Sequence, residues 1–148
     1  MSHDKSRMID DATAAYIVEN RKCFEDLKQV ASQLAGLLVL SASGSKEAVP
    51  DHPMLHAAGE LFQDAVNAMR SARPTERARC HHEHLARASS MLGGALKEAR
   101  AGLDAGLDVD RVLVPLRAGY RELEQAADEL PGFEKVSYER ACCGGRAQ

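Results

Sequence analysis

Apolar side chains recur at intervals of three, four and seven residues over about 8–40, and this spacing sets the fold class of the chain. The stripe consists of Ile9, Tyr16, Phe24, Leu27, Ala31, Leu34 and Leu38. Residues at these intervals share one face of an α-helix, so the segment is predicted to be amphipathic and to bury that face. Three later segments, at about 51–71, 74–103 and 110–130, have the same kind of pattern. No convincing alternation of apolar and polar residues indicates a strand.

Turn-forming residues separate the four predicted helices. Small residues around Gly44 end the first helix, and Asp51 is expected to cap the second, with Pro53 in its first turn. Pro74 is expected to end the second helix and to open the third. Pro115 is expected either to kink the fourth helix or to mark a later start. Short connections between four amphipathic helices favour an antiparallel up-and-down four-helix bundle.

The composition fits one such all-α domain. The chain has 148 residues, of which 45% are apolar and 28% charged, which is typical of a globular protein with a real core. Aromatic residues make up only 4%, and a core of Ala and Leu suits closely packed helices. We expect a single helical-bundle domain over residues 1–132. Residues 133–148, which have little periodic apolar content, are expected to form a flexible C-terminal tail.

The sequence indicates a cytoplasmic protein that neither crosses membranes nor binds nucleic acid. Its first residues lead into no apolar leader segment, and the longest apolar run, at 34–40, falls far short of the roughly 20 residues that span a bilayer. Four cysteines without a leader are typical of reduced thiols. A net charge of −3, and the absence of aromatic residues among the arginines of 70–87, argue against nucleic-acid binding.

Titratable chemistry concentrates at residues 80–84, which read Cys-His-His-Glu-His. His81 and His82 precede Leu85 of the third apolar stripe by four and three residues, so both are predicted to be partly buried. The simplest interpretation is that acidic residues of neighbouring helices accept hydrogen bonds from them. The acids expected at this level of the bundle are Glu25, Glu60, Asp64 and Glu129.

A metal site is one alternative interpretation, because imidazoles and carboxylates on facing helices form metal sites in bundle cores. The candidate ligands are His81, His82, Glu60, Asp64, Cys142 and Cys143. The adjacent tail cysteines suit a soft metal ion or a strained disulfide, although a tail whose thiols have no role is the simpler interpretation. A further ladder of His52, His56 and Glu60 shares one helix face but is expected to lie roughly 12 Å from the other histidines.

A second alternative comes from residues 84–95, His-Leu-Ala-Arg-Ala-Ser-Ser-Met-Leu-Gly-Gly-Ala. This segment is similar to the phosphoacceptor motif of histidine phosphotransfer domains, in which a basic residue, Gly and two small residues occupy positions +3 to +6. The resemblance implies a four-helix bundle with an exposed phosphoacceptor, His84, beside the cation Arg87. Ala88 would admit the receiver domain, although Arg87 and Ala88 replace the Lys and Gly of the family.

Two structural expectations accompany the phosphotransfer hypothesis. His84 lies about 100° around the helix from Leu85, so it is predicted to point away from the core. A bend at Gly93 and Gly94 suits the hypothesis, whereas a straight helix through residue 94 counts against it.

The primary interpretation is a non-enzymatic bundle that acts as a protein-interaction or oligomerisation module. The chain contains no Gly-rich phosphate loop, Ser/His/Asp arrangement or cofactor fingerprint, and no cofactor is required. The first helix, about 45 Å long, exceeds the second, which favours pairing with a protein partner or another copy. Five arginines within 70–87 and eight acids within 104–134 are expected to pair across neighbouring helices. Phosphotransfer through His84 and Arg87 is the first alternative function, and metal binding the second.

Overall fold

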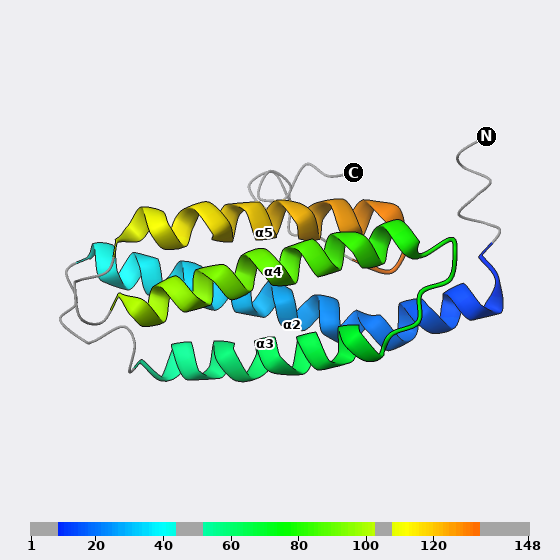
Figure 1. Ribbon diagram of the computed structural model, residues 1–148, viewed down its shortest axis with the longest axis horizontal. Coiled ribbons are helices and arrows are strands. Elements are labelled where there is room, and N and C mark those ends of the chain that lie inside the picture. Colours follow the sequence, from blue (N-terminus) through cyan, green and yellow to red (C-terminus); the bar gives the residue numbers. More distant parts are fainter. Residues whose placement is uncertain (1–8, 44–51, 103–107, 134–148) are drawn as a thin grey trace, which may run out of the picture.

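The computed structural model describes residues 9–43, 52–102 and 108–133, which form a bundle of four helices (Figure 1). The helices are α2 (Asp11–Ala42), α3 (Pro53–Ser71), α4 (Arg79–Ala101) and α5 (Val109–Glu129). These described ranges contain no strand. The predicted all-α four-helix bundle is therefore confirmed. None of the helices is both long and apolar enough to cross a membrane, within the residues that the structure describes.

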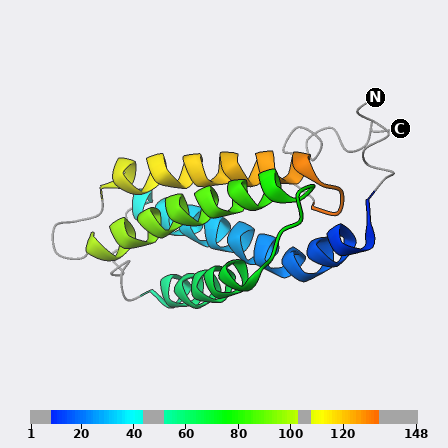
Figure 2. The ribbon, with the colours of Figure 1, turned by 45° about the vertical axis from the view of Figure 1, so that its right-hand side comes forward.

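Consecutive helices run in opposite directions in Figures 1 and 2. Contacts between α2 and α3 agree, because Cys23 bonds to Ala65 whereas Gly36, further along α2, faces Met54, which is earlier on α3. The longest helix is α2, and its N-terminal end extends past the C-terminal end of α3 (Figure 1). The alternation is the up-and-down arrangement that short connections favour.

Local polar contacts fix where the helices begin. The carboxylate of Asp10 caps α2 by accepting a hydrogen bond from Thr13 N at 2.8 Å. His52 caps α3 through Nδ1, which accepts from Met54 N at 3.1 Å. The predicted cap, Asp51, lies just outside the described residues.

The third helix begins at Arg79, so the prediction that Pro74 opens it is wrong by five residues. Thr75 explains the difference. Its hydroxyl accepts from Ala78 N at 3.3 Å and bonds to the Thr13 hydroxyl of α2 at 2.7 Å, which holds the segment in a turn before the helix starts. The fourth helix starts at Val109, and Pro115 lies inside it, so the alternative of a later start is wrong.

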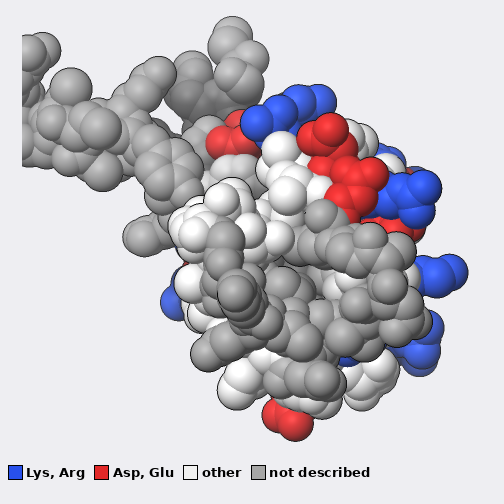
Figure 3. Space-filling model, turned by 90° about the vertical axis from the view of Figure 1, so that its left-hand side faces the viewer, with Lys and Arg blue, Asp and Glu red and all other residues white. Residues whose placement is uncertain are grey.

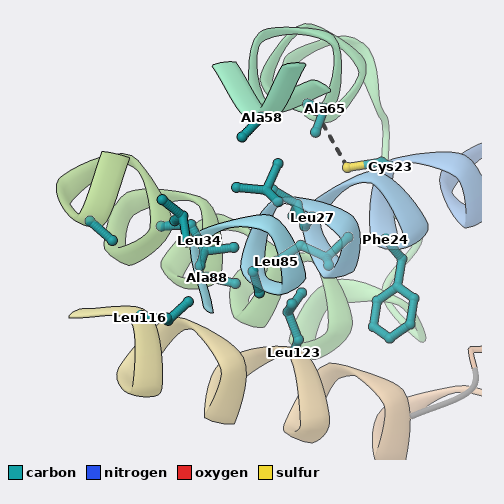
Figure 4. Packing of buried hydrophobic residues seen from close by; sticks show 14 of the residues in the cluster. Cys23, Phe24, Leu27, Leu34, Ala58, Ala65, Leu85, Ala88, Leu116 and Leu123 are labelled. Carbon is teal, nitrogen blue, oxygen red and sulfur yellow. Dashed lines mark hydrogen bonds between the residues drawn. The ribbon is translucent and has the colours of Figure 1, made fainter. Parts of the chain in front are cut away.

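All four helices contribute to one apolar core, and Figure 4 shows its side chains pointing toward one another. Six residues of the predicted first stripe are buried, namely Tyr16, Phe24, Leu27, Ala31, Leu34 and Leu38. Small buried residues such as Ala58, Ala65 and Ala88 let the helices approach closely. The Cys23 thiol donates to the Ala65 carbonyl oxygen at 3.4 Å, drawn as a dashed line in Figure 4.

Phe133 belongs to this core, although it is the first residue of the expected tail. Its side chain is 5% exposed, and its ring centroid lies 5.2 Å from that of Phe24 on α2. The chain folds back at Gly132, which has a φ of 93° that glycine tolerates best. The core therefore extends one residue beyond the predicted boundary at 132, and residues 134–148 lie outside the described part of the chain.

Two glycines provide a test of the packing of α4 against α5. We expect Gly119→Ala to lower the free energy of unfolding by about 1 kcal/mol, because its new methyl group would lie 2.9 Å from Cγ of the fully buried Leu92. Gly94→Ala should instead raise it by about 1 kcal/mol, since no neighbouring atom lies within 4 Å and alanine favours helix. Urea denaturation at pH 7 measures both, and stabilisation by both substitutions would contradict the close contact.

Candidate functional site

His81 lies in the core where α4 faces α2. Its side chain is 0% exposed, and Nδ1 lies 2.8 Å from the Tyr16 hydroxyl oxygen. The imidazole ring stacks on Phe133 with the two centroids 4.0 Å apart. Nε2 is buried and has no partner within the described residues. His81 is therefore a neutral residue of the core.

The surroundings of His81 disfavour its charged form. Burial lowers the pKa of His81 from the ordinary 6.5 to about 4, and the neighbouring His82 and His84 act in the same direction. The expected hydrogen bonds from His81 to acidic residues are absent from the described part of the structure. Tyr16 takes their place because α2, not an acidic face, covers this side of α4.

His82 is half-buried and lies beside the same tyrosine. Its ring meets the Tyr16 ring edge-on at a centroid distance of 6.3 Å, and Nδ1 is buried without a partner among the described residues. Burial lowers the pKa of His82, while the nearby Glu83 acts to raise it. The part of the chain that the structure describes thus provides no acidic hydrogen-bond partner for His82 either.

His84 lies between α4 and α5, where it contacts two acidic residues of α5. Nδ1 is 2.9 Å from Glu122 Oε2, and Nε2 is 3.8 Å from Glu129 Oε1. The His84 side chain is only 14% exposed. The prediction of an exposed His84 is wrong, because the position beside the Leu85 stripe faces the neighbouring helix rather than solvent.

Arg87 completes a polar cluster that we call the α4–α5 clasp, formed by His84, Arg87, Glu122 and Glu129. Arg87 Nε donates to Glu122 Oε1 at 3.0 Å, and its guanidinium also lies 3.1 Å from His84 Nδ1. In any one tautomer that nitrogen either donates to Glu122 or accepts from Arg87. The hydrogen bond from His84, and then that from Arg87, lower the pKa of the Glu122 carboxyl. The clasp supports the expected pairing of the basic and acidic helices.

The clasp bears on the chemistry that His84 can perform. Its Nδ1 is hydrogen-bonded to Glu122 and its side chain is only 14% exposed, whereas a phosphoacceptor needs a nitrogen that a donor can reach. Helix α4 also continues through Gly93 and Gly94 to Ala101, so the two glycines do not end it, and a helix that runs on through residue 94 counts against phosphotransfer. Both observations count against the phosphotransfer hypothesis, which stays a prediction.

The four predicted metal ligands that the structure describes, His81, His82, Glu60 and Asp64, are not brought together into a metal site. His81 is buried in the core, whereas Glu60 and Asp64 are exposed on α3. Within 9–43, 52–102 and 108–133, no group of three or more His, Cys, Asp or Glu side chains is arranged to hold a metal ion. Cys142 and Cys143 lie outside these ranges, so their role stays a prediction.

An open groove between α2 and α5 is a surface feature that the sequence did not reveal. It has a volume of about 430 Å³. Its walls are Ala31, Ser32 and Ala35 of α2 and Leu113, Leu116, Arg117, Tyr120, Arg121 and Glu124 of α5. Ala31 and Leu116 are buried at its floor, and the short side chains of Ser32 and Ala35 leave the space above them open.

Two exposed valines adjoin this α2–α5 groove. Val39 lies one turn beyond Ala35 on the same face of α2, and Val114 follows Leu113 on α5. Each is 67% exposed, so two large apolar side chains lie open to solvent beside the groove. Figure 3 views the end of the bundle at which α2 ends and α5 begins. Acidic and basic side chains lie side by side on one edge there, and uncharged residues cover much of the described surface.

The described residues thus form a helical bundle in which His81, His82 and His84 lie wholly or partly buried between helices, and in which an open groove runs between α2 and α5. Comparison of the chain with known protein families, curated proteins and solved structures finds no match. Its function is therefore inferred from its own geometry.

Proposed function

We propose that the protein is a non-enzymatic, cytoplasmic helical bundle that binds a protein helix along the α2–α5 groove, as an interaction or oligomerisation module. The observation that supports this proposal most directly is the open groove together with the exposed Val39 and Val114 beside it. Covering apolar surface contributes about 25 cal/mol per Å², and an amphipathic helix seated between two helices is a common way to cover it.

The chemistry of the groove favours binding over catalysis. Its lining residues include no histidine or cysteine, and its polar groups are two arginines, one serine, one tyrosine and one glutamate. The histidines that could act as bases or ligands lie elsewhere, with His81 bonded to Tyr16 and His84 held in the α4–α5 clasp. The proposed function requires no cofactor.

A photo-cross-linking amino acid at Ser32, introduced in cells that produce the full chain, tests this function. We expect a discrete adduct of higher mass, because Ser32 is an exposed groove residue. Ala35→Arg should abolish the adduct by filling the groove. Ala15→Arg, at an exposed position nearer the start of the same helix and outside the groove, should leave it unchanged. Absence of an adduct, or equal adducts in both variants, would rule out the proposed function.

A further inference from the structure

The exposed face of α5 beside the groove carries a self-complementary order of charges. Arg117, Arg121, Glu124 and Asp128 follow one another at spacings of four, three and four residues, which places them on one helix face. Two basic residues come first along the helix and two acidic residues follow. If a second copy of this helix lies antiparallel against the first, the basic residues of each helix therefore face the acidic residues of the other.

Arg121 and Glu124 are available for contacts with another molecule. Both line the α2–α5 groove, and they are only three residues apart. Even so, they form no ion pair with each other or with any other residue in the part of the chain that the structure describes. By contrast, Glu122, on the side of α5 that faces α4, forms an ion pair with Arg87 of α4 at 3.0 Å. Arg121 and Glu124 thus remain for a partner.

We infer that the groove binds a second copy of this chain, whose α5 lies antiparallel to the first α5 about a two-fold axis midway between Arg121 and Glu124. This inference rests on the proposed function and names its partner. The symmetry brings Arg121 against Glu124 of the partner subunit, and Arg117 against Asp128 of the partner subunit. Each contact occurs twice, as in every two-fold interface.

The groove supplies the apolar part of this interface. Ser32 and Ala35 leave room for side chains of the second α5, much as ridges of one helix pack into the grooves of another. Val114 lies near the start of α5, so in the antiparallel arrangement it faces the C-terminal end of the partner helix. A parallel arrangement would instead place arginines against arginines and acids against acids.

Charge reversal provides a test that a structural role within one chain cannot imitate. Analytical ultracentrifugation of the full chain, with reductant because Cys80 is exposed, should show a concentration-dependent dimer. Arg121→Glu and Glu124→Arg should each weaken dimerisation roughly tenfold or more, because two attractive contacts become repulsive. Arg70→Glu, with the same charge change on α3, should have no effect, and all variants should keep wild-type helicity by circular dichroism.

Mixing the two single variants is the decisive step. Across the inferred two-fold, the new Glu at 121 of one chain meets the new Arg at 124 of the other, while the native pair survives on the opposite side. The mixture should therefore form heterodimers with affinity close to wild type. A wild-type chain that stays monomeric, a dimer insensitive to the single reversals, or a mixture that fails to recover would overturn the inference.

The cross-linking experiment separates this inference from the proposed function. An adduct from position 32 that contains two copies of the chain is expected. An adduct with an unlike protein that Ala35→Arg abolishes would overturn the homodimer and leave the proposed function standing. Absence of any adduct would overturn both.

Discussion

Acidification is expected to lower the free energy of unfolding through His81, by about 2 kcal/mol between pH 7 and pH 5 and about 3 kcal/mol by pH 4. The folded-state pKa of His81 is about 4, below the ordinary value of 6.5. Between these values the unfolded chain binds a proton that the folded chain does not, so stability falls as the pH falls. The contribution is fully present above pH 6.5.

The cause of this effect is the geometry around the ring. Nδ1 faces the Tyr16 hydroxyl, Nε2 has no partner within the described residues, and Phe133 covers the ring face. An imidazolium would need an acceptor for both N–H groups, and the core supplies none at Nε2. The depressed pKa of Glu122 acts in the same direction, but only as the pH falls through and below its ordinary value of 4.5, so the change between pH 7 and pH 5 reports the histidines.

Urea denaturation at pH 7, 6 and 5 measures the loss. The double substitution Tyr16→Phe with His81→Leu removes both buried polar partners, so we expect it to keep most of the stability at pH 7 and to flatten the acid dependence. His82→Gln isolates the smaller contribution of the neighbouring ring, whose pKa is also lowered. An NMR titration of the His81 ring gives its pKa directly, and a midpoint near 6.5 would contradict the prediction.

The elements of the fold were predictable from the sequence because they depend on local chemistry. The 3.6-residue period of the apolar stripes places Tyr16, Phe24 and Leu34 in the core, and α3 ends at Ser71, before Pro74, as predicted. The start of α4 was not predictable in this way. It depends on the contact between Thr75 and Thr13, two residues that are 62 positions apart.

The orientation of side chains at helix–helix boundaries was harder to predict. A helical period locates the centre of the buried face, but it does not say which flank meets a neighbouring helix. His84 illustrates this. A position 100° from the stripe faces solvent on an isolated helix, whereas in the bundle it faces Glu122 of α5. The α2–α5 groove escaped prediction for the same reason, because it depends on how two distant helices pack. The only local signal was the pair of small residues, Ser32 and Ala35, beside an otherwise bulky stripe.

Phe133→Ala is expected to lower the free energy of unfolding by about 3 kcal/mol, near the lower end of values typical of removing a buried phenylalanine. The ring is 5% exposed and contacts Phe24 of α2 and His81 of α4, so its loss leaves a cavity between helices. Phe62→Ala, at a half-buried ring over Gly93, should cost less. Phe133→Leu should cost about 1 kcal/mol, which keeps the comparison measurable if the alanine variant unfolds.

Phe133→Ala also tests whether the Phe133 ring controls the loss of stability that His81 causes at low pH. Once the Phe133 ring is gone, water can reach His81, and better hydration of the imidazolium should raise the His81 pKa toward 6.5. The loss of stability between pH 7 and pH 5 should therefore be smaller in Phe133→Ala than in wild type, although the variant is less stable at pH 7. Phe62→Ala should keep the wild-type pH dependence. An unchanged acid slope in Phe133→Ala would show that burial by this ring does not control His81, and would leave its contact with Tyr16 and the neighbouring histidines as the cause.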